Sequence, residues 1–195
     1  PLYGLALVLL YGPDLWHRHR RALALSLATF VLFCLPGLPH WLSPAGRARA
    51  EFLLDPPSDW LGQYLSYLSP SFLVLSGDAN VRHSMEGWGQ LYLFALVSVP
   101  LGLLALRHRR EAARLLGPWL LLFPLPAALT DPGHAMRACL GLPVLELLSA
   151  AGIVSLVRRL QGTARTVAGV ATAVIVLAFA GAHTQDYFSD YGDDS

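Results

Sequence analysis

Apolar residues in this chain fall into long blocks separated by short polar stretches. They follow neither the period of two of a half-buried strand nor the 3.6-residue period of an amphipathic helix. Six blocks can be distinguished: Leu2–Tyr11, Ala22–Leu38, Leu91–Leu106, Leu115–Leu129, Ala138–Val157 and Thr166–Ala182. A helix needs about 20 apolar residues to cross a bilayer, so several blocks would need flanking residues. The pattern predicts an all-α membrane protein with about six transmembrane helices.

The longest polar interval, at about residues 39–90, separates the second block from the third. Its aromatic residues Trp60, Tyr64 and Tyr67 are close to helical spacing, and Trp and Tyr suit the headgroup level of a membrane. We therefore expect a partly helical outer loop between the second and third helices. The expected organisation is a polytopic membrane domain over residues 1–182, followed by a tail at residues 183–195.

The composition agrees with this class of protein. The chain is 54% hydrophobic and 14% charged, whereas an ordinary soluble domain has about 25% charged residues. The net charge of +1 gives no reason to expect a nucleic-acid partner. Cys34 and Cys139 lie in or beside apolar blocks and indicate neither a disulfide framework nor a metal site. The lipid bilayer is the partner that the composition predicts.

The distribution of charge predicts the topology. Arginine is concentrated in three polar stretches, which follow the first, third and fifth blocks: Trp16–Arg21, Arg107–Arg114 and Arg158–Arg165. Carboxylates concentrate in the other polar stretches and in the tail. An arginine excess in every second loop is what the positive-inside rule describes. We therefore expect the Arg-rich loops to be cytoplasmic, and the long loop, the loop at Thr130 and the tail to face outward from the inner membrane.

The first candidate for chemistry is "GDANVRHSMEGWG", from Gly77 to Gly89. It gathers five polar or charged residues within nine positions: Asp78, Asn80, Arg82, His83 and Glu86. Arginine offers a planar fork of donors suited to phosphate, while aspartate and asparagine suit sugar hydroxyls. The stretch is either a binding loop for an anionic or sugar ligand, or a solvated loop of turn residues.

The second candidate is "DPGHAMR", in which Pro132 and Gly133 form a turn between two apolar blocks. Arg137 follows where the fifth block begins, on the face where arginine is otherwise sparse. Backbone N–H groups at a helix start attract anions, so Arg137 could hold a lipid phosphate there. The alternative is an arginine that extends to the headgroups and fixes the depth of the helix.

The fifth block contains a carboxylate and a run of small residues. Glu146 lies near its middle, where a charge is costly unless it has a partner or a water-filled cavity. A protonated or hydrogen-bonded structural role is the alternative. The run "SAAGIVS" suits close packing between helices. We find no nucleotide-binding loop, no HExxH motif and no Cys/His spacing of a metal site, so the motifs predict no metal.

Two stretches resemble parts of bacterial family 39 glycosyltransferases, which are similar to protein O-mannosyltransferases and to lipid A aminoarabinose transferases. In the outer loop the matching positions are Tyr67, Ser69, Pro70, Phe72, Leu73, Gly77, Asp78, Asn80, Arg82, His83, Gly89, Leu91 and Tyr92. In "PLPAALTDPGHAMRACLGLPVLELLSAAG" they are Pro126, Ala128, Thr130, His134, Arg137, Pro143 and Gly152. The two elements cover the chain from about Tyr64 to Gly152.

The resemblance implies a GT-C fold and an enzyme of the cell envelope. Such enzymes transfer a sugar from a polyprenyl-phosphate carrier to an acceptor on the non-cytoplasmic face. It also implies that the acidic catalytic residues lie in a first outer loop near the N-terminus. The present chain has no such loop, so we expect a C-terminal part of the enzyme and assign no catalytic base.

The resemblance also suggests roles for the polar residues of both loops. Arg137 and His134 would bind the donor phosphate, Arg82 and His83 are the second choice for that task, and Asp78 and Asn80 would orient the sugar. Two other classes stay open, namely a transporter or flippase and a non-catalytic membrane subunit. A transporter should show inverted repeats, and none is evident in the sequence.

Overall fold

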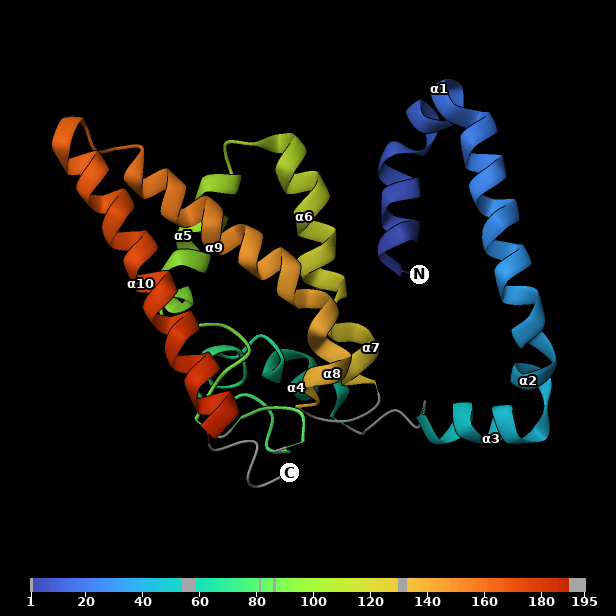
Figure 1. The fold of residues 1–195 in the computed structure, drawn as a ribbon. Coiled ribbons are helices and arrows are strands. Elements are labelled where there is room, and N and C mark those ends of the chain that lie inside the picture. Colours follow the sequence, from blue (N-terminus) through green and yellow to red (C-terminus); the bar gives the residue numbers. More distant parts are fainter. Residues whose placement is uncertain (1, 54–58, 81, 86, 130–132, 190–195) are drawn as a thin grey trace.

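The computed structural model describes residues 2–53, 59–80, 82–85, 87–129 and 133–189, and this part of the chain is helical with no strand (Figure 1). Its α-helices are α1 Leu2–Cys34, α2 Leu38–Leu42, α3 Pro44–Leu53, α4 Trp60–Ser66, α5 Ala95–Leu106, α6 Arg110–Leu122, α7 Pro124–Ala128, α8 Ala135–Ala138, α9 Leu142–Val157 and α10 Gly162–Ser189. Shorter turns are η1 Leu35–Gly37, the π-helical η2 Ser71–Leu75 and η3 Cys139–Gly141. The predicted all-α class is confirmed for the described residues.

Within the described residues, three stretches of helix are long and apolar enough to cross a membrane: His19–Leu42, Ala135–Val157 and Gly162–Ser189. They contain the second, fifth and sixth predicted blocks and indicate a membrane protein. The other three blocks take different forms. The first is the start of α1, which kinks at His19, and the third becomes the 12-residue α5. The fourth is divided between α6 and α7 at Phe123, where Pro124 and Pro126 remove backbone donors.

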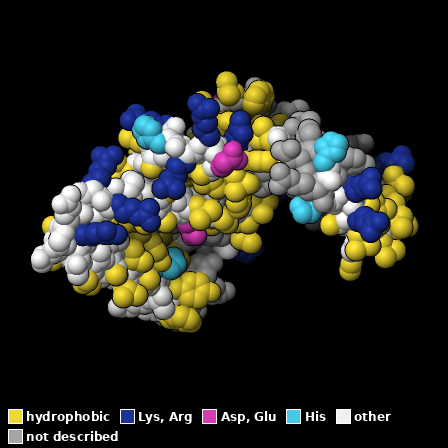
Figure 2. All heavy atoms as spheres, turned by 90° about the horizontal axis from the view of Figure 1, so that it is seen from above, with side chains coloured by type: hydrophobic (Ala, Val, Ile, Leu, Met, Phe, Trp, Pro, Cys, Tyr) yellow, Lys and Arg dark blue, Asp and Glu magenta, His cyan; other side chains and the backbone are white. Residues whose placement is uncertain are grey.

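The three Arg-rich stretches lie at one end of the molecule. The kink of α1, the α5–α6 turn and the α9–α10 turn are all at the top of Figure 1, whereas α2, α4, α7 and α8 are at the bottom. Figure 2 looks onto the upper end and shows many basic side chains and few acidic ones. Ten of the 14 basic residues belong to these stretches, and the exceptions are Arg47, Arg49, Arg82 and Arg137. The alternation of arginine in the sequence therefore corresponds to a concentration of basic residues at one end of the molecule.

Helices α5 and α9 form the closest helix pair. Gly102 of α5 lies against the backbone of Leu148, and Gly152 of α9 lies against the backbone of Ser98. The buried hydroxyls of Ser98 and Ser149 form a hydrogen bond between the two helices. Small residues allow two helix backbones to approach closely, so the prediction that "SAAGIVS" serves packing is confirmed at Ser149 and Gly152.

The hydrophobic core extends from this pair to the lower end of the molecule. It combines residues of α4–η2, α5, α7, α8 and α9: Tyr67, Phe72, Val74, Leu91, Ala95, Leu106, Phe123, Ala127, Ala128, Ala138, Val144, Leu145 and Leu148. The Tyr64 hydroxyl donates to the Leu121 carbonyl at 2.8 Å, and the Leu91 amide donates to the Leu73 carbonyl at 2.8 Å. The second half of the 39–90 segment is therefore packed against the helices.

Candidate functional site

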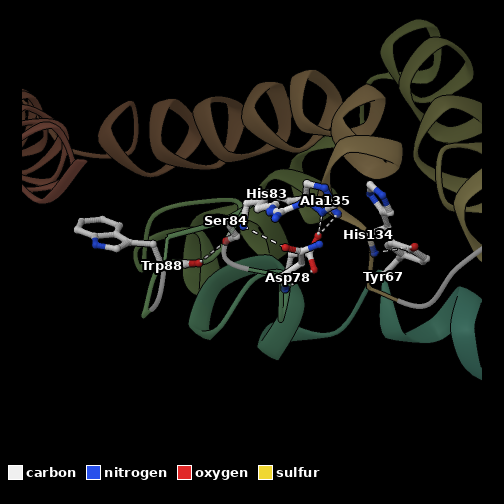
Figure 3. A network of polar contacts seen from close by, with 9 residues as sticks. Tyr67, Asp78, His83, Ser84, Trp88, His134 and Ala135 are labelled. Carbon is white, nitrogen blue, oxygen red and sulfur yellow. Dashed lines mark hydrogen bonds and ion pairs between the residues drawn. The ribbon is translucent and has the colours of Figure 1, made fainter. Parts of the chain in front are cut away.

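The two loops that carry the candidate residues meet at the lower end of the helices. The Oδ2 atom of Asp78 accepts a hydrogen bond of 2.9 Å from the amide of Ala135, the first residue of α8. These residues are 57 positions apart in the chain. Figure 3 shows Asp78 and His83 beside Ala135, with Tyr67 and His134 next to them. One carboxylate thus joins the outer loop to the start of the fifth apolar block.

The loop around Asp78 is shaped by side chains that bond to nearby amides. Asp78 Oδ1 accepts from the Asn80 amide at 2.9 Å, and Asn80 Oδ1 accepts from the Arg82 amide at 3.1 Å. Such turns are the usual local use of Asp and Asn. They reverse the direction of the chain, which places His83 Nδ1 3.0 Å from Asp78 Oδ2. His83 is therefore held by the same oxygen that accepts from Ala135.

His134 is fixed from the other side of the cluster. Gly133 before it has a φ of +66°, a conformation that glycine adopts without steric cost. The His134 amide then donates to the Tyr67 hydroxyl at 2.9 Å. Its ring stacks on the ring of His83, with centroids 4.3 Å apart and planes inclined by 23°. The buried Nδ1 of His134 has no hydrogen-bond partner among the residues that the structure describes.

The carboxyl of Asp78 is stabilised in its charged form. Burial by itself raises the pKa of Asp78, but hydrogen bonds from the amides of Ala135 and Asn80, together with His83, outweigh it and lower the pKa below its ordinary value. The side chains of Asp78 and His83 are 7% and 23% exposed. A charged carboxylate in this position attracts a cation beside it.

The remaining candidate residues differ in how close they lie to this cluster and in how exposed they are. Arg137 is half-buried in α8, and its amide donates to the His134 carbonyl at 3.2 Å, so it lies one turn beyond that histidine. Asn80 and Arg82 are exposed, and their hydrogen bonds show that both belong to the turn after Asp78. The predicted roles in phosphate and sugar binding stay predictions. Glu86, Thr130, Asp131 and Pro132 lie outside the described residues.

Tyr67 and Trp88 contribute in ways that the sequence did not indicate. The side chain of Tyr67 is fully buried, and its hydroxyl accepts a hydrogen bond from the His134 amide. The expected position of Tyr67 at the headgroup level stays a prediction. The Trp88 indole N–H donates to Asp186 of α10 at 3.0 Å. Residues 183–189, which we expected to begin a tail, continue α10, and residues 190–195 lie outside the described part of the chain.

Glu146 is exposed and lines a cavity. The cavity measures about 370 Å³ and lies between the loop at residues 89–92, α5, α9 and α10. Its polar lining comes from Gln90, Tyr92, Glu146, Ser149 and His183. Of the two explanations given above for this carboxylate, its position in the wall of a cavity favours a water-accessible one.

We expect Tyr67→Phe to destabilise the cluster more than Tyr64→Phe. The first change removes a buried acceptor from the His134 amide, and leaving such a donor unsatisfied costs about 1–3 kcal/mol. The second removes a hydrogen bond of an exposed hydroxyl, which contributes about 0.5–1.5 kcal/mol. Thermal unfolding of both variants in the same detergent gives the comparison. Equal midpoints would show that the Tyr67–His134 bond does not stabilise the loops.

The cluster offers chemistry that neither loop has alone. Ligand atoms of Asp78, His83 and His134 lie within 4.8 Å of one another, so the three side chains could hold one cation, and Arg137 is one helical turn away. Together they could bind an anionic headgroup between an arginine and two imidazoles.

A scan against protein-family models, a search of curated proteins and a search of solved structures each find no match to this chain.

Proposed function

We propose that this chain is part of a membrane glycosyltransferase of the GT-C type. The donor would be a sugar linked to polyprenyl phosphate, and the acceptor would be a protein, lipid or glycan outside the cytoplasm. The protein would lie in the inner membrane with its Arg-rich end toward the cytoplasm. The Asp78–His83–His134 cluster would then be on the outer side.

One observation carries this proposal. The two stretches that resemble family 39 enzymes meet at one end of the helices, where Asp78 and Tyr67 of the first accept hydrogen bonds from the start of the second. Arg137 is one turn away from this junction. This place is at the end of an apolar helix pair, opposite the Arg-rich turns. A lipid with a long apolar tail and a charged headgroup matches such a position, because its tail can follow the helices while its phosphate meets the polar cluster.

The chemistry would rest on the leaving group. When the bond between the anomeric carbon and the phosphate oxygen breaks, negative charge increases on polyprenyl phosphate. A fixed guanidinium stabilises that charge more in the transition state than in the ground state. Arg137 is the first choice for this task, with His134 beside it. Asp78 would act by positioning His83 and the start of α8, and no residue of this chain is proposed as the base that activates the acceptor.

A flippase or transporter is the second candidate, and the cavity at Glu146 favours it. An ionisable residue in an intramembrane cavity is common on the path of a substrate or proton. A transporter would move the lipid-linked sugar intact, whereas a transferase would break the bond between sugar and phosphate. The two classes therefore differ in their product.

Binding of the shared leaving group tests the proposal without knowing the sugar. The full-length protein in nanodiscs should bind polyprenyl phosphate at least about tenfold more tightly than polyprenol, because a charge-assisted hydrogen bond contributes about 1.5–3 kcal/mol. Equal binding of the two lipids would contradict a phosphate site. In proteoliposomes given a polyprenyl-phosphate-linked sugar and an acceptor, release of polyprenyl phosphate supports a transferase, whereas passage of the intact lipid to the other leaflet supports the transporter instead.

A further inference from the structure

We propose that Asp78, His83 and His134 form a binding site for a divalent transition metal, with Zn²⁺ as the preferred ion. The donor set contains two imidazole nitrogens and one carboxylate oxygen, which is a combination that zinc accepts. All three ligand atoms lie within 4.8 Å of one another. The site goes beyond the proposed function, and its existence does not depend on it.

The distances are close to those of a coordination shell. Tetrahedral zinc with bonds of about 2.0–2.1 Å places neighbouring ligand atoms roughly 3.3 Å apart. His83 Nδ1 and Asp78 Oδ2 are already 3.0 Å apart. The longest separation allowed by the 4.8 Å limit would have to shorten by about 1.5 Å. Because the rings of His83 and His134 are stacked, one ring would also have to turn out of the stack before both nitrogens could face the same ion. The ion would replace the proton between His83 and Asp78.

The surroundings of the three ligands favour an ion over the present hydrogen bonds alone. The Nδ1 of His134 is buried and lacks a hydrogen-bond partner among the described residues, although buried polar atoms normally have one. The amides of Ala135 and Asn80 hold the two oxygens of Asp78, which are outer contacts of the kind that orient a metal ligand. His83 remains 23% exposed, so an ion could enter from that side.

Three protein ligands leave a fourth position open, as in zinc sites that bind a further group. An oxygen of the donor phosphate could take that position, with Arg137 one turn away. This last step rests on the proposed function, whereas binding of zinc itself does not. Zinc affinity and polyprenyl-phosphate affinity are therefore measured separately.

The experiment is a zinc titration of the full-length protein, purified in detergent and freed of metal with a chelator. Competition with a chromogenic chelator gives the affinity for Zn²⁺, and Co²⁺ absorption reports the coordination geometry. His134→Ala and Asp78→Asn should each lower the affinity by more than the roughly 10- to 100-fold that an outer contact is worth. His183→Ala is the matched control, since its Nδ1 is also buried and lacks a partner in the described chain.

The outcomes decide between an ion site and a hydrogen-bonded cluster. One tight zinc per chain, lost in His134→Ala and Asp78→Asn but kept in His183→Ala, supports the proposal. Zinc should also raise the unfolding temperature of the wild-type protein and not that of the two ligand variants, which separates loss of the site from loss of the fold. Equal affinity in all four proteins would show that other histidines bind the ion, and no binding to the folded wild type would overturn the site.

Discussion

Replacing Gly152 with leucine is expected to prevent α5 and α9 from packing together. Even a Cβ atom at position 152 would overlap the carbonyl oxygen of Ser98, and it would come within 2.8 Å of the Gly102 amide nitrogen. These obstacles are backbone atoms, so no change of rotamer can relieve the overlap. The helices would have to separate, which also breaks the buried Ser98–Ser149 hydrogen bond. We expect the stability to fall by more than about 3 kcal/mol, beyond the usual range for overpacking.

Gly169→Leu provides the matched control for this experiment. Gly169 also lies within a long apolar helix, α10, but a Cβ atom there would meet nothing within 4 Å. Both changes add the same side chain and remove the same backbone freedom, so only the close approach differs. Thermal unfolding by circular dichroism and the elution profile in detergent should show loss of the folded protein for Gly152→Leu alone. Similar unfolding temperatures for the two variants would contradict the helix contact.

The sequence predicts the helices of this fold better than their lengths. Long apolar blocks determine where a chain can leave water, so all-α structure and the helices at Ala22–Leu38, Ala138–Val157 and Thr166–Ala182 could be predicted. Hydropathy contains no information about where a helix stops inside an apolar block. Pro124 and Pro126 divide one block into α6 and α7, and the third block yields only the short α5, because part of it packs against η2 through Leu91.

The members of the site could be selected from the sequence, but their partners could not. Asp78, His83 and His134 stand out as polar residues in turns beside apolar blocks. Only the tertiary structure brings His134 onto the ring of His83, because 50 residues of helix and loop lie between them. The same separation hides the metal ligands, since spacing rules for metal sites apply to ligands on neighbouring turns. The role of Tyr67 depends on its burial, which helical spacing alone does not determine.

Under the proposed function, Arg137→Ala is expected to reduce transfer from a polyprenyl-phosphate sugar by about 100- to 1000-fold, the loss seen when a group that stabilises transition-state charge is removed. Arg137→Lys should recover only part of the rate, because an ammonium keeps the charge but lacks the planar fork that fits a phosphate. The loss should appear mainly in kcat, since leaving-group charge is largest in the transition state. Initial rates of polyprenyl-phosphate release by the full-length protein measure this effect.

The comparison with Arg47→Ala distinguishes catalysis from anchoring in the membrane. Arg47 is an exposed arginine of α3 at the same end of the molecule, so its loss removes an equal charge without touching the cluster. If Arg137 only fixed the depth of its helix, lysine would replace it fully, and alanine would lower the stability of the protein rather than kcat. A normal rate for folded Arg137→Ala would therefore remove Arg137 from the donor site. A normal rate for Arg47→Ala together with a low one for Arg137→Ala would assign the phosphate to the α8 end of the cluster.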